Sequence, residues 1–178
     1  MAKLAIEARW SLLVDTIEAI ARARSATAII ELAAGSARQI AEADGITIVR
    51  RIGEETDYLV ENTIEPLWAG LQFPIDKCLA GRAMVEEQTI VISDINQVEN
   101  IPLNVYLATF IRSLVAVPIG DPHPTHAICA YWRETRTIEP EAIALMEALG
   151  RAMGAAFALI DTLTVANARA GIGSPTRR

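Results

Sequence analysis

The sequence is poor in cysteine, histidine and clustered positive charge, and each shortage excludes a class of protein. Two cysteines among 178 residues are too few for a small scaffold held by disulfides, and two histidines offer few metal ligands. Acidic residues outnumber basic ones by 22 to 16, and no Lys or Arg cluster occurs before Arg177 and Arg178. Because phosphate contacts need such clusters, we expect no nucleic-acid partner.

Long apolar runs are also missing. The first ten residues include Lys3 and Glu7, where a signal peptide needs an uninterrupted apolar core. The longest apolar run, 152–160, is too short to span a bilayer. We therefore expect a cytoplasmic protein without a membrane segment, in which Cys78 and Cys129 are free thiols.

The sequence does contain apolar residues in helical spacing, and they make up enough of it, 52%, for the core of one domain. The spacing predicts a helix from Ile6, a second between Ser25 and Gly45, and a long closing helix that begins at Pro140 and keeps its apolar stripe to Leu163. In the first helix, the residues that we expect to face the core are Ile6, Trp10, Leu13, Val14, Ile17, Ile20 and Ala21.

The middle of the chain favours strands. We expect a hairpin of 46–52 with 56–60, and further strands at 89–93, 113–119 and 126–133, with short helices over 78–87 and 103–111. Pro118 should lie at a strand end or on a sheet edge, because it has no N–H to donate. The segment 61–75 is apolar but irregular, which is typical of a stretch that lines a pocket. This order predicts an α+β fold with a central antiparallel sheet.

Three segments resemble the GAF family, over roughly 12–163. Residues 79–83, followed by 89–95, resemble its small Gly-containing helix and the strand after it that ends in Asp. Residues 111–119 are similar to its S-x-L-x-V-P strand, and 138–149 resemble its final helix, which begins with a proline. The strand 126–131 departs from the pattern, since it lacks the family's Gly.

The resemblance implies a sheet of about five to six strands, with the N- and C-terminal helices on one face and short helices and loops forming a pocket on the other. We expect one free-standing domain over 1–170, with its core at about 12–163, and a mobile tail over 171–178. Family members bind cyclic nucleotides, tetrapyrroles, haem or small metabolites, so the ligand or cofactor stays unknown.

Several residues fall in segments that line the cavity in this family. Arg112 would offer a bidentate donor to a carboxylate or phosphate. The alternative interpretation is that these residues close the core without any ligand. The other candidate ligand residues are Trp68, Phe73, Cys78, Met84, Tyr106, Phe110 and Tyr131.

Enzymatic alternatives match less well. In the free methionine-sulfoxide reductase branch a Cys directly precedes the Gly of the small helix, whereas Cys78 lies three residues before Gly81, and the loop 94–112 holds no second Cys. The sequence 76–79 resembles a secondary bilin motif, but 104–107 lacks the primary chromophore cysteine. We therefore expect no enzyme, with a Cys78-dependent reductase as the alternative.

Metal ligands are also sparse. Asp121, His123 and His126 lie around a Pro-rich turn, which is more typical of a solvated hairpin tip than of a metal site. His126 and Cys129 are three residues apart on one strand and should face opposite sides. We expect no metal.

Gly150 and Gly154 lie one turn apart on the closing helix, where they would let another helix approach closely. With Trp10 they predict the interface of a homodimer. The alternative is that the glycines pack against the first helix of the same chain. We expect a non-catalytic sensor in signal transduction that signals through terminal-helix packing to a partner such as a histidine kinase. A ligand-free interaction domain is the structural alternative.

Overall fold

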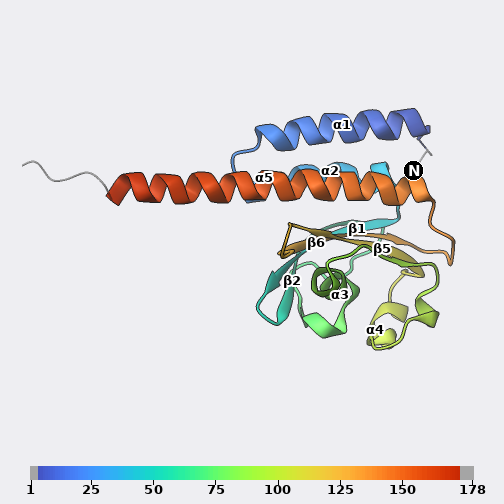
Figure 1. Cartoon of the computed structure of the whole chain (residues 1–178). Coiled ribbons are helices and arrows are strands. Elements are labelled where there is room, and N and C mark those ends of the chain that lie inside the picture. The colour runs from blue at the N-terminus through green and yellow to red at the C-terminus, as the bar shows by residue number, and fades with distance from the viewer. Residues whose placement is uncertain (1–3, 173–178) are drawn as a thin grey trace, which may run out of the picture.

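A six-stranded antiparallel sheet separates the helices of the chain into two groups (Figure 1). The computed structural model describes residues 4–172, with side chains to residue 168. The strand order is β3-β2-β1-β6-β5-β4, which confirms the predicted α+β fold. The strands are β1 (Gly45–Ile52), β2 (Glu55–Thr63), β3 (Gln72–Pro74), β4 (Ile90–Ile92), β5 (Ser113–Ile119) and β6 (His126–Trp132).

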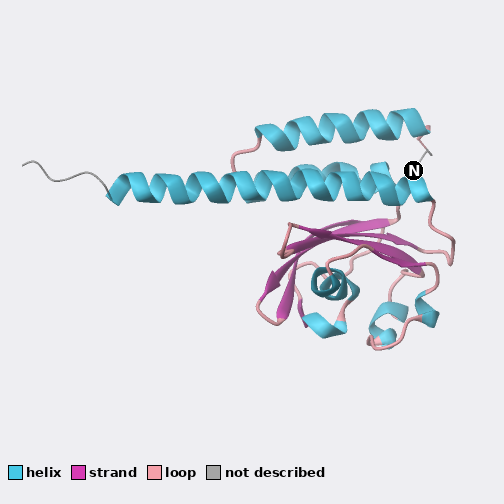
Figure 2. Ribbon diagram, in the orientation of Figure 1, coloured by secondary structure: helices cyan, strands magenta, loops and turns pink. Residues whose placement is uncertain are grey.

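Three long helices cover one face of the sheet. α2 (Ala26–Ala41) and α5 (Pro140–Ile172) contact the strands, and α1 (Ile6–Arg22) packs on top of these two helices (Figure 2). The opposite face carries α3 (Leu79–Glu86), α4 (Leu103–Leu107) and two single turns, η1 (Ile75–Lys77) and η2 (Ile95–Gln97). The sheet therefore has a separate hydrophobic core on each face.

Local signals account for several element ends. The Ser25 hydroxyl accepts a hydrogen bond from the Ala28 N–H at 3.2 Å, as expected of an N-cap. α2 ends at Glu42, which takes the left-handed conformation that we expected of Gly45. Pro118 lies within β5, but β4 pairs only as far as Ala116 and leaves this side of β5 without a neighbouring strand. A missing N–H is harmless there.

The predicted inward stripe of α1 is right only in part. Leu13 and Ile20 are buried as predicted, but Arg9 is buried as well, whereas Trp10 and Val14 are 41% and 52% exposed. Periodicity assigns the apolar residues to the core and the arginine to solvent. The helix instead turns Arg9 inward, because acceptors on α2 and near α5 bind its guanidinium.

α5 is long and apolar enough to cross a membrane by length and composition alone. Its stripe of Leu145, Leu149 and Met153 is buried in the core between the helices and the sheet, and 28% of the apolar window is buried in all. The helix extends beyond the ends of α1 and α2 (Figure 1). Of the predicted mobile tail over 171–178, the first two residues end α5, and the remainder lies outside the described residues.

Candidate functional site

Five aromatic side chains meet on the sheet face that α3 and α4 cover. Trp68 is central: its ring centroid lies 5.2 Å from that of Tyr106, 5.4 Å from Tyr58, 5.9 Å from Phe73 and 6.3 Å from Tyr131. The rings meet edge to face, at interplanar angles between 73° and 88°, which is the arrangement that aromatic quadrupoles favour. We call Tyr58, Phe73, Tyr106 and Tyr131 the Trp68 cage.

Trp68 lies on an irregular loop, 64–71, that Glu61 holds in place. The Glu61 carboxylate, near the end of β2, accepts hydrogen bonds from the backbone N–H groups of residues 67–69 at 2.9–3.2 Å. At the other end of the loop, Gly70 donates its N–H to the Tyr58 carbonyl at 2.8 Å and has a φ of 81°. The loop is therefore fastened through its backbone on both sides of Trp68.

Cys78 caps the N-terminus of α3. Its thiol accepts a hydrogen bond from the Gly81 N–H at 3.3 Å and lies 3.4 Å from the Thr56 hydroxyl. Burial raises the pKa of the Cys78 thiol and outweighs these hydrogen bonds, which lower it. Burial also raises the pKa of Cys129, on β6, to about 12. Both groups are therefore neutral thiols at pH 7, whereas nucleophilic sulfur chemistry needs the thiolate.

Gly81 allows α3 to lie against η1. A Cβ at this position would overlap the carbonyl oxygen of Ile75. The glycine of the small helix is thus required by a backbone-to-backbone contact, and this contact places Cys78 beside the Trp68 cage.

Two hydroxyl groups of the cage have fixed partners. The Tyr131 hydroxyl lies 2.7 Å from the Thr47 hydroxyl, and the Tyr106 hydroxyl accepts a hydrogen bond from the Leu79 N–H at 3.1 Å. Burial raises the pKa of Tyr106 and Tyr131 well above the usual value. The cage is therefore uncharged at any physiological pH.

The space left inside the cage is small. It amounts to about 10 Å³, and one water molecule needs roughly 10–15 Å³. Trp68 and its cage thus fill the compartment that the resemblance assigns to a ligand. The lining residues are Tyr58, Trp68, Phe73, Lys77, Cys78, Pro102, Val105 and Tyr106.

The structure brings together some of the predicted ligand residues. Trp68, Phe73, Cys78 and Tyr106 line the residual cavity. Met84 and Tyr131 belong to the same core without lining this cavity, and Phe110 packs at its edge.

Two of the predicted ligand residues have partners within the chain. Arg112 Nη1 donates to the carbonyls of Thr109 and Ile111, at 2.8 and 2.7 Å. Phe110 packs against the bare backbone of Gly45, where a Cβ would lie 2.9 Å from its ring. These contacts place both side chains at the starts of β5 and β1.

Tyr58 is the cage residue that the sequence did not reveal. Strict alternation along β2 would put Tyr58 on the same face as Val60, which packs against the helical core. A β-bulge intervenes, since Ile48 pairs with Val60 and Val49 with Tyr58. The extra residue turns Tyr58 to the opposite face.

The predicted dimer residues have different environments. Trp10 is largely exposed on α1 and donates its indole N–H to Glu141. The two glycines do not form a surface for a partner helix. A Cβ on Gly150 would lie 2.9 Å from Val117 Cγ1, and one on Gly154 would lie 3.1 Å from the backbone of Gly120. Their role is to let α5 approach β5 and the turn after it.

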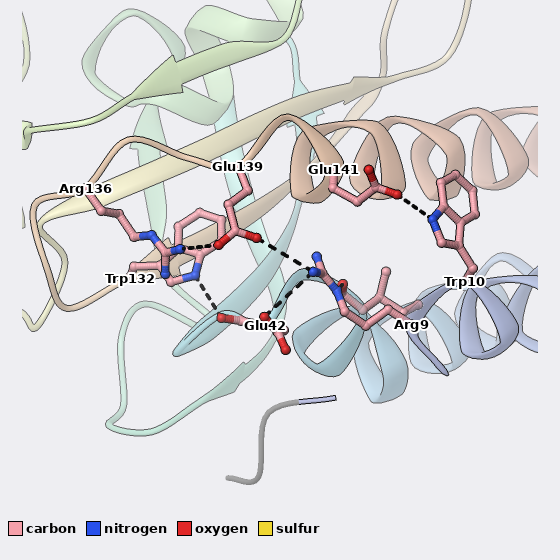
Figure 3. A network of polar contacts seen from close by, with 8 residues as sticks. Arg9, Trp10, Glu42, Trp132, Arg136, Glu139 and Glu141 are labelled. Carbon is pink, nitrogen blue, oxygen red and sulfur yellow. Dashed lines mark hydrogen bonds and ion pairs between the residues drawn. The ribbon is translucent and has the colours of Figure 1, made fainter. Parts of the chain in front are cut away.

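A buried arginine joins α1 to the rest of the helical layer (Figure 3). Arg9 is 3% exposed, and its Nε donates to the Ile40 carbonyl at 2.8 Å. Its Nη1 lies 3.7 Å from a Glu42 carboxylate oxygen and 3.9 Å from one of Glu139. The Glu42 carbonyl in turn accepts a hydrogen bond from Trp132 Nε1 at 2.9 Å. We call Arg9, Glu42, Glu139 and Trp132 the Arg9 clamp.

Strand β6 runs between the two clusters. Tyr131 belongs to the Trp68 cage on one face of the sheet, and the next residue, Trp132, belongs to the Arg9 clamp on the other. The backbone reinforces the link, because Asp44, just after the α2 cap, donates its N–H to the Tyr131 carbonyl at 2.8 Å.

The histidines do not converge on a metal site. His126 stacks on Phe157 of α5, with ring centroids 4.6 Å apart, and so faces away from Cys129, as predicted. Burial, with a contribution from Arg50, lowers the pKa of His126 to about 4. Within residues 4–172 no group of three or more His, Cys, Asp and Glu side chains could hold a metal ion.

Comparisons with known proteins agree with this architecture at the level of the fold. No family model matches the chain, and no curated protein matches it. Among solved structures, free methionine-R-sulfoxide reductase from Neisseria meningitidis, in complex with its substrate, has a TM-score of 0.78 at 13% identity. The match covers 92% of this chain and 96% of the reductase chain.

Two further structures are GAF domains. One, from a phosphoenolpyruvate-protein phosphotransferase of Coxiella burnetii, has a TM-score of 0.76 at 14% identity, covering 91% of this chain and 99% of that one. The other, the phycocyanobilin-bound GAF domain of a cyanobacterial phytochrome, has a TM-score of 0.73 at 19% identity, covering 89% and 97%. The chain therefore has the fold of GAF domains.

Proposed function

We propose that this GAF module is a non-catalytic sensor, in which a small molecule bound at the Trp68 cage alters the packing of the terminal helices. The observation that carries this proposal is the position of β6, which places consecutive residues in the Trp68 cage and in the Arg9 clamp. A ligand that displaces Tyr131 acts on the same strand backbone that holds Trp132, and through it on Glu42 and Arg9.

The state of the sulfur atoms supports a role without catalysis. A free methionine-sulfoxide reductase of this fold needs a nucleophilic thiolate and a partner that resolves the oxidised sulfur. Here burial raises the pKa of both Cys78 and Cys129. Cys78 also uses its sulfur to cap α3, which is a structural role.

The output in this proposal passes through α1 and α5 to a second copy of the chain, and from there to a signalling partner such as a histidine kinase. Large apolar side chains on both helices are exposed: Val14 by 52%, Leu159 by 56% and Leu163 by 49%. A homodimer that covers these residues would link helix packing to assembly.

Purification without denaturant, followed by native mass spectrometry and an absorption spectrum, tests the sensor proposal. We expect a retained small molecule, or a compound from a metabolite screen that raises the melting temperature by mass action. Hydrogen exchange should then show a change at α1, although α1 lies on the opposite side of the sheet from the cage. A screen without any stabilising compound, or a ligand that leaves exchange at α1 unchanged, would contradict the proposal.

A further inference from the structure

Two stripes run side by side along α1, and each residue of the second directly follows a residue of the first. The first stripe is buried and consists of Arg9, Leu13, Thr16 and Ile20. The second stripe consists of Trp10, Val14, Ile17 and Ala21. Successive residues of an α-helix lie about 100° apart around its axis. A rotation of α1 by that angle therefore exchanges one stripe for the other.

The stripe that the structure buries is the less apolar of the two. It includes Arg9 and Thr16, whereas the second stripe has no charged or hydroxyl-bearing residue. Trp10 and Val14 are nevertheless 41% and 52% exposed. Hydrophobic burial alone would turn the second stripe toward α2 and α5. The observed orientation is instead held by the hydrogen bonds of Arg9 to the Ile40 carbonyl and of Thr16 to the Ser36 hydroxyl.

The polar contacts that hold this orientation are incomplete. Arg9 is 3% exposed, and among the described residues its Nη2 has no hydrogen-bond partner. A buried donor without a partner costs stability, because it has lost its water. This cost, together with the apolar side chains that α1 leaves in water, offsets part of what the Arg9 clamp contributes. The free-energy difference between the two orientations is narrowed accordingly.

Open grooves on both sides of α1 leave room for its side chains to move. One groove, of about 650 Å³, lies between α1 and the C-terminal half of α5, and the other, of about 620 Å³, lies between α1 and α2. Small side chains form low ridges that do not interlock with a neighbouring helix. Such side chains line both grooves: Ala152, Ala155 and Ala156 on α5, and Ala28, Gly35 and Ser36 on α2.

We propose that α1 is a two-position switch, which rotates by about 100° around its own axis between the Arg9-in orientation of this structure and a Trp10-in orientation. In the Trp10-in orientation, Trp10 and Val14 face α2 and α5, and Arg9 enters solvent. Residues 23–25, which connect α1 to α2, are the hinge. This inference rests on the proposed function, because it says which change of terminal-helix packing the sensor uses.

Two engineered cysteines report the orientation of α1. Position 14 is 52% exposed and position 16 is 7% exposed, and rotation reverses this order. A maleimide should therefore distinguish the two orientations in Val14→Cys and Thr16→Cys. The native Cys78 and Cys129 are buried, and burial raises the pKa of both thiols, so they react slowly. Detachment of α1, in contrast to rotation, would expose both engineered cysteines.

Arg9→Glu drives the rotation, because a carboxylate at position 9 would lie beside those of Glu42 and Glu139. In this background the maleimide should modify Val14→Cys about tenfold more slowly than in the otherwise wild-type protein, and Thr16→Cys about tenfold faster. Changes of this size are expected when a state that is populated at about 10% becomes the major one.

Arg24→Glu is the matched control, because it makes the same change of charge at an exposed residue after the end of α1. It should leave both modification rates unchanged. Faster modification of both cysteines in Arg9→Glu would mean that α1 detaches, and unchanged rates would mean that Arg9 does not set its orientation. Either result refutes the switch.

A second variant decides the matter if Arg9→Glu does not fold. Trp10→Gln removes the largest side chain that the Trp10-in orientation buries, and its amide keeps a donor for Glu141, the partner of Trp10. It should slow the modification of Thr16→Cys at least about threefold. An unchanged or faster rate contradicts the proposal.

None of these measurements needs a ligand, so their failure is distinct from a failure of the proposed function. A protein in which α1 rotates, but which no compound stabilises, keeps the switch and loses the sensor. A ligand that changes hydrogen exchange at α1, in a protein whose two engineered cysteines always react in parallel, keeps the sensor and removes the rotation.

Discussion

Replacement of Arg9 by methionine should loosen α1 without unfolding the rest of the domain. Methionine keeps most of the apolar stem and removes the guanidinium. The charge-assisted hydrogen bond to the Ile40 carbonyl, at 2.8 Å, contributes roughly 1.5–3 kcal/mol. The ion pairs with Glu42 and Glu139 are longer, 3.7 and 3.9 Å, and the two carboxylate side chains are 15% and 45% exposed, so together they add no more than about 1 kcal/mol. We expect a total loss of about 3 kcal/mol.

Urea denaturation followed by circular dichroism measures that loss, and the melting temperature should fall by about 6–12 °C. Hydrogen exchange locates it: amides of α1 should lose protection, while those of α2 and the sheet keep theirs. Glu139→Gln is the matched control, because its carboxylate is 45% exposed and lies at the outer limit of the ion pair, so we expect less than about 1 kcal/mol. A loss below about 0.5 kcal/mol in Arg9→Met, or equal deprotection of α1 and α2, would refute this account of the clamp.

Three further predictions concern other residues. The pKa of His126 falls from 6.5 to about 4 on folding, so the folded state favours the neutral imidazole. The stability that depends on this neutral form is fully present above pH 6.5 and is lost as the pH falls toward 4. The wild type should therefore lose about 1–2 kcal/mol between pH 7.5 and pH 5, relative to His126→Gln, in urea titrations at each pH. Gly81→Ala should destabilise the protein by more than about 3 kcal/mol, because its Cβ overlaps a carbonyl oxygen, whereas Gly35→Ala, in open space within α2, should be neutral or stabilising by up to about 1 kcal/mol; comparable effects of the two would contradict the packing argument. Neither the wild type nor Cys78→Ser should reduce free methionine-R-sulfoxide in a thiol-coupled assay, and activity that disappears in the variant would establish the reductase instead.

The fold could be predicted from the sequence because its signals are local. Ser25 marks the start of α2, and the apolar stripe after Pro140 marks a helix long enough to cover the sheet. The orientation of α1 could not be predicted in the same way. Periodicity ranks residues by their affinity for water, and it sends Trp10 inward and Arg9 outward. The buried position of Arg9 depends on acceptors in α2 and before α5, which are distant in sequence.

In the candidate site, too, some residues could be predicted from the sequence and others could not. The irregular, apolar character of the segment around Trp68 and Phe73 indicated a pocket lining, and the structure places both at the cavity. Tyr58 was missed because a bulge reverses the alternation of β2. Arg112 was assigned to a ligand because sequence offers no sign that a guanidinium will bond to carbonyls one and three residues earlier. Strand registers are settled by tertiary contacts, and a polar side chain can bond to its neighbouring backbone instead of to a ligand without any mark in the sequence pattern.

The interaction free energies within the Arg9 clamp limit how far a ligand at the Trp68 cage can change the packing of the helices. The Trp132 hydrogen bond to the Glu42 carbonyl is the direct side-chain link from β6 to the clamp, and such a bond contributes about 1 kcal/mol. The clamp itself holds α1 with about 3 kcal/mol by the estimate for Arg9. Loss of the Trp132 link therefore shifts the equilibrium of α1 by at most about fivefold, while the contacts of Arg9 keep the helix docked. A ligand at the Trp68 cage should thus change how often α1 opens rather than release it. An exchange experiment should accordingly show faster opening of α1 at unchanged overall fold, and complete deprotection of α1 on ligand binding would mean that the coupling follows another route than β6.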